Sequence, residues 1–103
     1  MVVTKTESGK ITAVLTGEID HHSARIIRTN IDRDIQCQKP KTLILDFSGV
    51  DFMDSSGIGL IMGRYKMMLE NDGQVIIRNP KPYVKKVLNL AGITRIVKLE
   101  EQK

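Results

Sequence analysis

The chain has 103 residues, of which 41% are hydrophobic and 27% are charged, a composition typical of one globular domain. Aromatic residues make up only 4% and tryptophan is absent, so we expect an aliphatic core. The first residues do not form the apolar run of a secretory signal, and no segment approaches the length of a membrane span. The lone Cys37 has no partner for an internal disulfide. These features predict a cytoplasmic protein.

The net charge of +4 raises the possibility of nucleic-acid binding, but the distribution of the basic residues argues against it. They are spread along the chain, and the nearest approach to a cluster is Lys81, Lys85 and Lys86. The two tyrosines and two phenylalanines are scattered and provide no stacking platform for bases. We therefore expect these lysines to form the solvated side of an amphipathic helix, and we expect neither a nucleic-acid nor a membrane partner.

The first part of the chain predicts a hairpin followed by a helix. Residues 2–7 and 11–16 have strand patterning and are joined at Ser8-Gly9-Lys10, a hairpin turn signal. Asp20 is placed to cap a helix that runs to about Gln38. We expect the inner face of this helix to contain Ala24, Ile27, Ile31 and Ile35.

The middle of the chain repeats the alternation of strand and helix. Pro40 ends the first helix before a short apolar run over 42–47 that is typical of a buried strand. A second helix follows Ser55 and ends near 71–73, where Asn-Asp-Gly is a stop signal. Residues 74–78 then predict a third buried strand.

The last part predicts one more helix and one more strand. Asn79-Pro80 ends the preceding strand, and Pro82 opens a helix that stops at Gly92. Residues 95–99 have the pattern of a final short strand. We expect one face of the helix to contain Val84, Val87, Leu88 and Ala91.

Strands that alternate with helices predict an α/β fold. We expect one domain over residues 1–103, with a mixed, mostly parallel sheet, an N-terminal hairpin and about three packed helices. The segments 17–20 and 54–56 both follow parallel strands, at the sheet edge where such folds usually carry their sites. Asp20 and Ser56 are therefore expected to be neighbours.

The segment Asp54-Ser55-Ser56 places two hydroxyl groups at the start of the second helix. Aspartate and serine accept hydrogen bonds from the free N–H groups of a first helical turn. A helix N-terminus also attracts anions, so a phosphate on either serine would be tolerated there. The segment therefore predicts a switch that is controlled by modification, and the residues alone leave open which serine carries the phosphate.

Helical spacing separates the second helix into two faces. The predicted core face, centred almost opposite Ser56, contains Ile58, Ile61, Met62, Tyr65, Met68 and Leu69. The face shared with Ser56, flanked by Arg64 and Lys66, contains Gly59, Leu60, Gly63, Met67 and Glu70. Two glycines inside a helix lower its stability by roughly 1 kcal/mol each relative to alanine. A protein partner that lies close to the helix backbone and to exposed apolar side chains would explain why they are present. The alternative is that the glycines allow another part of this chain to pack closely.

An enzymatic role finds less support. A serine hydrolase needs a general base held by a third group, and the only histidines, His21 and His22, lie beside Asp20. The serines lack the Gly-x-Ser-x-Gly turn, and no second carboxylate is clearly available to orient an imidazole. Adjacent histidines point apart on a helix, and the helical glycines do not form a phosphate-binding loop. We expect no enzyme activity, no metal and no cofactor.

Two motifs carry a resemblance to a known family. Residues 17–22, Gly-Glu-Ile-Asp-His-His, and residues 52–59, Phe-Met-Asp-Ser-Ser-Gly-Ile-Gly, continuing through 63–66, resemble the STAS domain. More narrowly, they resemble the sporulation anti-sigma factor antagonists of the SpoIIAA type, over nearly the whole chain. The resemblance implies binding to a kinase-type anti-sigma factor, which releases a sigma factor. It also implies that this serine kinase phosphorylates Ser56, that a phosphoserine phosphatase removes the phosphate, and that Asp20 contacts the partner.

The resulting hypothesis is a non-enzymatic protein in which Ser56 is the phosphate acceptor. The expected partner-binding residues are Asp20, Asp54, Ser55, Gly57, Gly59, Leu60, Gly63 and Met67. The alternative is a STAS scaffold or partner subunit without a phosphorylation switch. Family members commonly end in a further helix after the last strand, whereas this chain ends at residues 100–103. This difference leaves open how one side of the sheet is covered and what the oligomeric state is.

Overall fold

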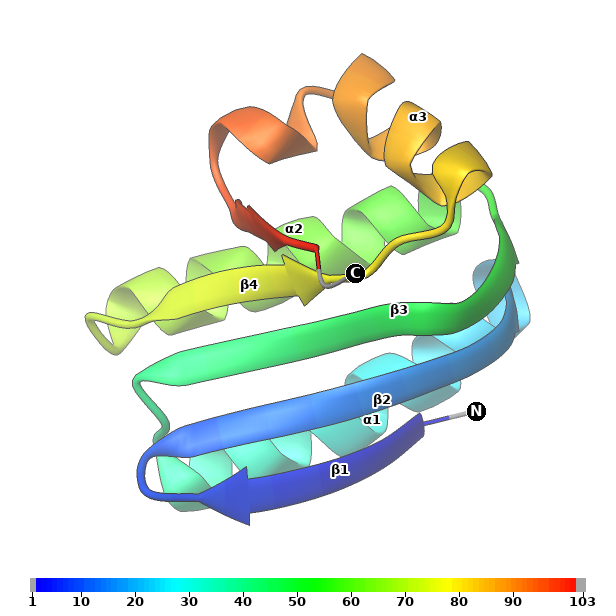
Figure 1. The fold of residues 1–103 in the computed structure, drawn as a ribbon. Coiled ribbons are helices and arrows are strands. Elements are labelled where there is room, and N and C mark those ends of the chain that lie inside the picture. Colours follow the sequence, from blue (N-terminus) through cyan, green and yellow to red (C-terminus); the bar gives the residue numbers. More distant parts are fainter. Residues whose placement is uncertain (1, 102–103) are drawn as a thin grey trace.

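The computed structural model describes residues 2–101, so Met1, Gln102 and Lys103 of the predicted domain lie outside the described residues. Strands and helices alternate after an initial hairpin, as the sequence predicts (Figure 1). The elements are β1 (Val2–Glu7), β2 (Lys10–Ile19), α1 (His21–Gln38), β3 (Thr42–Met53), α2 (Ser55–Glu70), β4 (Gln74–Arg78), α3 (Pro82–Leu90), the 3-10 helix η1 (Ile93–Arg95) and β5 (Lys98–Glu100).

The five strands form one sheet in the order β1-β2-β3-β4-β5. The β1–β2 pair is an antiparallel hairpin, and its turn residues Ser8 and Gly9 have φ values of 45° and 76°, as hairpin turns with two positive φ angles require. The other three strand pairs are parallel. This confirms the predicted mixed, mostly parallel sheet.

Two helices cover one face of the sheet. In Figure 1, α1 lies behind β2 and α2 lies behind β3 and β4. Ile27, Ile31 and Ile35 of α1 are buried, and Ala24 packs partly buried against the same core, which confirms the predicted inner face. Val84 and Leu88 of α3 join this core from the end of β3.

Three predicted strand boundaries and the predicted position of Ala91 are wrong. Strands β2 and β3 continue to Ile19 and Met53, because their parallel pairing persists through irregularities near Gly17. The last strand begins only at Lys98, since η1 occupies the start of the predicted 95–99 segment. Ala91 is exposed because α3 ends at Leu90. Gly92 follows in the left-handed conformation, with φ of 76°.

The opposite sheet face has no helix over it in the part of the chain that the structure describes (Figure 1). Strand register places Thr12, Ile44 and Ile76 side by side on this face. Ile44 and Ile76 are nevertheless buried, and Arg78 pairs with Glu100 at 2.7 Å on the same face. No helix within residues 2–101 has the length and apolar character needed to cross a membrane.

Candidate functional site

Strand pairing brings the two predicted loops to one edge of the sheet. Ile19 at the end of β2 pairs with Met53 at the end of β3, so the next residues, Asp20 and Asp54, leave the sheet together. The Asp54 backbone N–H donates to the Ile19 carbonyl at 3.2 Å. This confirms the expected neighbourhood of the two loops at the carboxyl ends of the parallel strands.

Asp54 caps α2 through its side chain. The extended backbone at Asp54 lets one carboxylate oxygen accept a hydrogen bond from the Ser56 N–H at 2.8 Å. Ser55 is exposed at the first helical position, whereas Ser56 is half-buried. The cap uses the backbone of Ser56 and leaves its hydroxyl outside this hydrogen bond.

Asp20 caps α1 in a reciprocal arrangement with Ser23. The Asp20 carboxylate accepts from the Ser23 N–H at 2.9 Å, and the Ser23 hydroxyl oxygen accepts from the Asp20 N–H at 3.0 Å. The bond from the Ser23 backbone, then that from its side chain, lowers the pKa of Asp20 below its usual value. The capping role of Asp20 is confirmed, and its contact with a partner stays a prediction.

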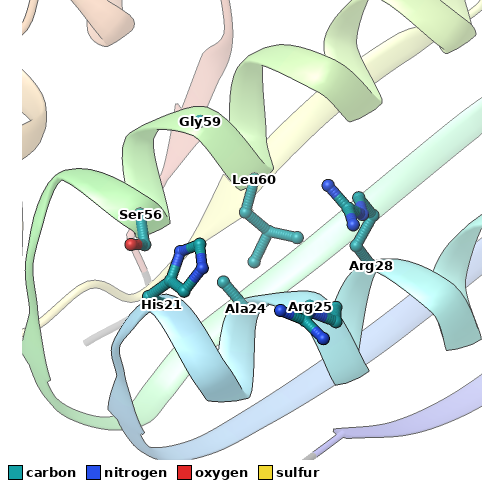
Figure 2. Close-up of a pocket in the computed structure, with 7 residues that line it drawn as sticks. All are labelled: His21, Ala24, Arg25, Arg28, Ser56, Gly59 and Leu60. Atoms are coloured by element: carbon teal, nitrogen blue, oxygen red, sulfur yellow. The ribbon is translucent and has the colours of Figure 1, made fainter.

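A pocket of about 230 Å³ lies between the first turns of α1 and α2. Its walls are formed by His21, Ala24, Arg25, Arg28, Ser56, Gly59 and Leu60. Figure 2 shows the His21 ring beside the Ser56 hydroxyl, with Arg25 and Arg28 further along α1. Among residues 2–101, no acidic side chain lines this pocket. Ser56 therefore borders a basic hollow.

Sequence reasoning missed Arg25 and Arg28 as site residues. The signal was present, because His21, Arg25 and Arg28 recur at the spacing of one helical stripe. Two helices that follow neighbouring parallel strands also run in the same direction, so the first turn of α1 must lie near the first turn of α2. The stripe therefore predicts a basic surface on α1 close to Ser56.

The geometry does not reproduce a serine hydrolase. His21 and Ser56 line the same pocket, but the residues that the structure describes provide no hydrogen bond between them. The carboxylates on either side are engaged elsewhere, Asp20 with Ser23 and Asp54 with the Ser56 N–H. A general base needs a group that orients it, and within residues 2–101 no carboxylate is bonded to His21.

The glycines of α2 lie in two different environments. A Cβ atom on Gly57 would lie 2.1 Å from Cγ of Met53, so this glycine packs against its own chain. A Cβ on Gly59 or Gly63 would meet nothing within 4 Å. Gly59 and Gly63, the two glycines of the predicted partner face, therefore have room above them, whereas Gly57 lies close to Met53 of its own chain.

The predicted core face of α2 is largely confirmed, because Ile61 and Met68 are buried and Ile58, Met62 and Tyr65 pack partly buried against the core. The buried side also extends further around the helix than predicted. Leu69 of the predicted core face is 51% exposed, while Leu60, expected to be exposed, is only 4% exposed. Met67 is half-buried against the core. Helix α1 covers the side of α2 that contains Leu60 and Arg64, and helical spacing alone gives no information about a neighbouring helix.

A family model for the STAS domain matches residues 2–102. The chain belongs to the STAS domain family. An anti-sigma F factor antagonist from Paenibacillus polymyxa is 34% identical over 89 residues, which are 86% of this chain and 76% of that protein. The unphosphorylated form of the anti-sigma factor antagonist SpoIIAA has a TM-score of 0.88 at 31% identity, covering all of this chain and 89% of that one. The phosphorylated form of SpoIIAA, a Bacillus cell fate determinant, has a TM-score of 0.79 at 30% identity, covering all of this chain and 92% of that one.

This STAS domain also contains a buried arginine that was expected to flank the partner-binding face of α2. Arg64 of α2 is 6% exposed, and its Nε lies 2.8 Å from the Asp32 carboxylate of α1. The contact is not aligned as a hydrogen bond, so its attraction is Coulombic. Burial lowers the pKa of Arg64, Asp32 opposes this change, and Arg28 lowers it further. Arg64 therefore belongs to the packing between α1 and α2.

Proposed function

We propose that this STAS domain is an anti-sigma factor antagonist that is switched by phosphorylation of Ser56. In the unphosphorylated form it binds a kinase-type anti-sigma factor and thereby releases a sigma factor. The partner kinase phosphorylates Ser56, and a phosphoserine phosphatase restores the binding form. The domain itself supplies binding and carries out no catalysis. The likeness to antagonists in sequence and in structure supports this role.

The observation that carries the switch is the position of the Ser56 hydroxyl. It lies at the start of α2 on the wall of an open pocket, and within residues 2–101 it takes part in no hydrogen bond of the fold. The Asp54 cap holds the backbone N–H instead, so a phosphate on the hydroxyl breaks no native bond. Phosphorylation is therefore expected to change the surface and to leave the fold intact.

The surface around Ser56 fits a closely approaching partner. Gly59 and Gly63 continue the Ser56 side of α2 with space above their backbone, and Met67 offers part of an apolar side chain. Asp20, Asp54 and Ser55 border the same end of the molecule. In this proposal Leu60 supports the surface from beneath, because only 4% of it is exposed. A phosphate on Ser56 would stand in the path of the partner.

The test is a phosphorylation assay with the cognate anti-sigma factor and ATP, followed by intact-mass and fragment analysis. We expect one phosphate on Ser56, none on Ser56→Ala, and normal labelling of the matched control Ser55→Ala. Ser56→Ala should still bind the anti-sigma factor, because the capping bond comes from Asp54. Binding without any labelling would contradict the switch and indicate a fixed partner subunit. Labelling of Ser56→Ala at the wild-type level would move the acceptor to another residue.

A further inference from the structure

We propose that His21, Arg25 and Arg28 form an anion subsite that holds the phosphate of phosphorylated Ser56 on the protein's own surface. The inference rests on the proposed function, because it concerns the phosphorylated form of Ser56. The first two turns of α1 then contact the phosphate when Ser56 is phosphorylated.

Ser56 and the three basic side chains face the same pocket from two different helices. Ser56 lies on the α2 wall, and the three basic side chains lie on the α1 wall of the same pocket (Figure 2). His21 is the nearest in Figure 2, and Arg25 follows four residues later, about 6 Å along the axis. Arginine side chains are long and flexible, and a phosphate extends the serine into the hollow. In this proposal the arginines reach the phosphate through changes of rotamer.

The two arginines are available for such a contact. In the described residues, ion pairs involve Arg64, Arg78, Lys81 and Lys85, but neither Arg25 nor Arg28. Both side chains are exposed. The nearby carboxylates face other groups: Asp20 faces Ser23, Asp54 faces the Ser56 N–H, and Asp32 faces Arg64. Two guanidinium groups without an acidic partner beside a hydroxyl are suited to a phosphate monoester.

Phosphorylation would then change the pocket in two ways. The phosphate adds a charge of about −1.5 to −2 and three strong acceptor oxygens. It also pairs with Arg25 and Arg28 and so makes them unavailable to acidic groups of a partner. The charge of the pocket changes from basic to nearly neutral without any movement of the backbone.

The test uses phosphoserine incorporated during translation at position 56, and, as a matched control, at position 55. Both positions share the same helix N-terminus and the same Asp54 cap, but Ser55 does not line the pocket. The titration of each phosphate is followed by phosphorus NMR. We expect the phosphate at position 56 to lose its second proton at a pH lower by about 0.5 or more than the phosphate at position 55.

The double variant Arg25→Gln/Arg28→Gln should remove most of this difference. The double variant Arg33→Gln/Arg95→Gln, which loses the same charge at exposed arginines outside the pocket, should preserve it. His21→Gln, measured separately, reports how much of the difference in phosphate titration comes from the imidazole. Equal titration at the two positions, or a difference that the two double variants reduce equally, would overturn the subsite. Because no kinase is used, this outcome is independent of whether Ser56 is labelled by the anti-sigma factor.

Discussion

The two flanks of α2 lie in opposite environments, and glycine occurs on both. The buried flank consists of Gly57, Leu60, Ile61, Arg64 and Met68, and it packs on the sheet and on α1. The open flank consists of Ser56, Gly59 and Gly63, and it borders the pocket and solvent. A glycine is required by packing on the first flank and has space above it on the second.

The arginines between α1 and α2 differ in the same way. Arg64 is buried and paired with Asp32, whereas Arg25 and Arg28 are exposed and form no ion pair among the described residues. A paired, buried arginine contributes to the structure, and removing its partner is costly. Unpaired arginines at a pocket are free to recognise a ligand or a partner. The same residue type therefore supports the fold in one place and is available for function in the other.

The largest expected effect concerns the buried pair. Asp32→Ala leaves the Arg64 guanidinium buried without its counter-ion, and we expect a loss of about 2 kcal/mol or more in the free energy of unfolding. The matched control is Asp34→Ala on the same helix, which should change stability by no more than about 0.5 kcal/mol. Urea denaturation of both variants measures the difference. Equal stability of the two would show that Arg64 needs no partner.

Alanine substitutions at two glycines sharpen the comparison of the flanks. Gly57→Ala would force the new methyl group against Met53, which is itself 1% exposed, and should destabilise the domain by about 1–2 kcal/mol. Gly59→Ala, two residues away, should stabilise it by several tenths of a kcal/mol because the helix gains propensity. Thermal melts should therefore shift in opposite directions. A shift in the same direction would contradict the assignment of the two flanks.

A substitution on the open flank tests the partner surface. Gly63→Leu adds a side chain where its first atom meets nothing, so the fold should be retained. Its bulk would block a closely approaching partner, and the affinity for the anti-sigma factor should fall by a factor of ten or more, about 1.4 kcal/mol. Gly63→Ala serves as the smaller control, with a weaker effect on binding. A lower melting temperature with unchanged affinity per folded molecule would place Gly63 in the packing of the chain instead.

The sequence predicts strand order and helix starts well because these depend on local signals. Asp20, Asp54 and Pro82 lie at the starts of their helices as expected, and the Ser8-Gly9 turn forms the hairpin. The burial of the side of α2 that faces α1 could not be predicted in this way. The burial of Leu60 and Arg64 depends on α1, and a charged residue is assigned to solvent unless its partner is known.

The same limit applies to the site. Ser56 and the two capping aspartates are recognisable within short segments, because capping chemistry is local. The basic wall of the pocket comes from a helix separated from Ser56 in the sequence, and only the parallel pairing of β2 and β3 brings the two together. The structure places three basic side chains on the other wall of the pocket that Ser56 lines.

The central claim is that a phosphate on Ser56 prevents partner binding without unfolding the domain. The most direct measurement is a calorimetric titration of the anti-sigma factor with the unmodified protein and with protein that carries phosphoserine at position 56, each also examined by circular dichroism. We predict identical spectra and an affinity at least tenfold lower for the phosphorylated protein. Equal affinities, or a phosphorylated protein that has lost its native spectrum, would contradict the account.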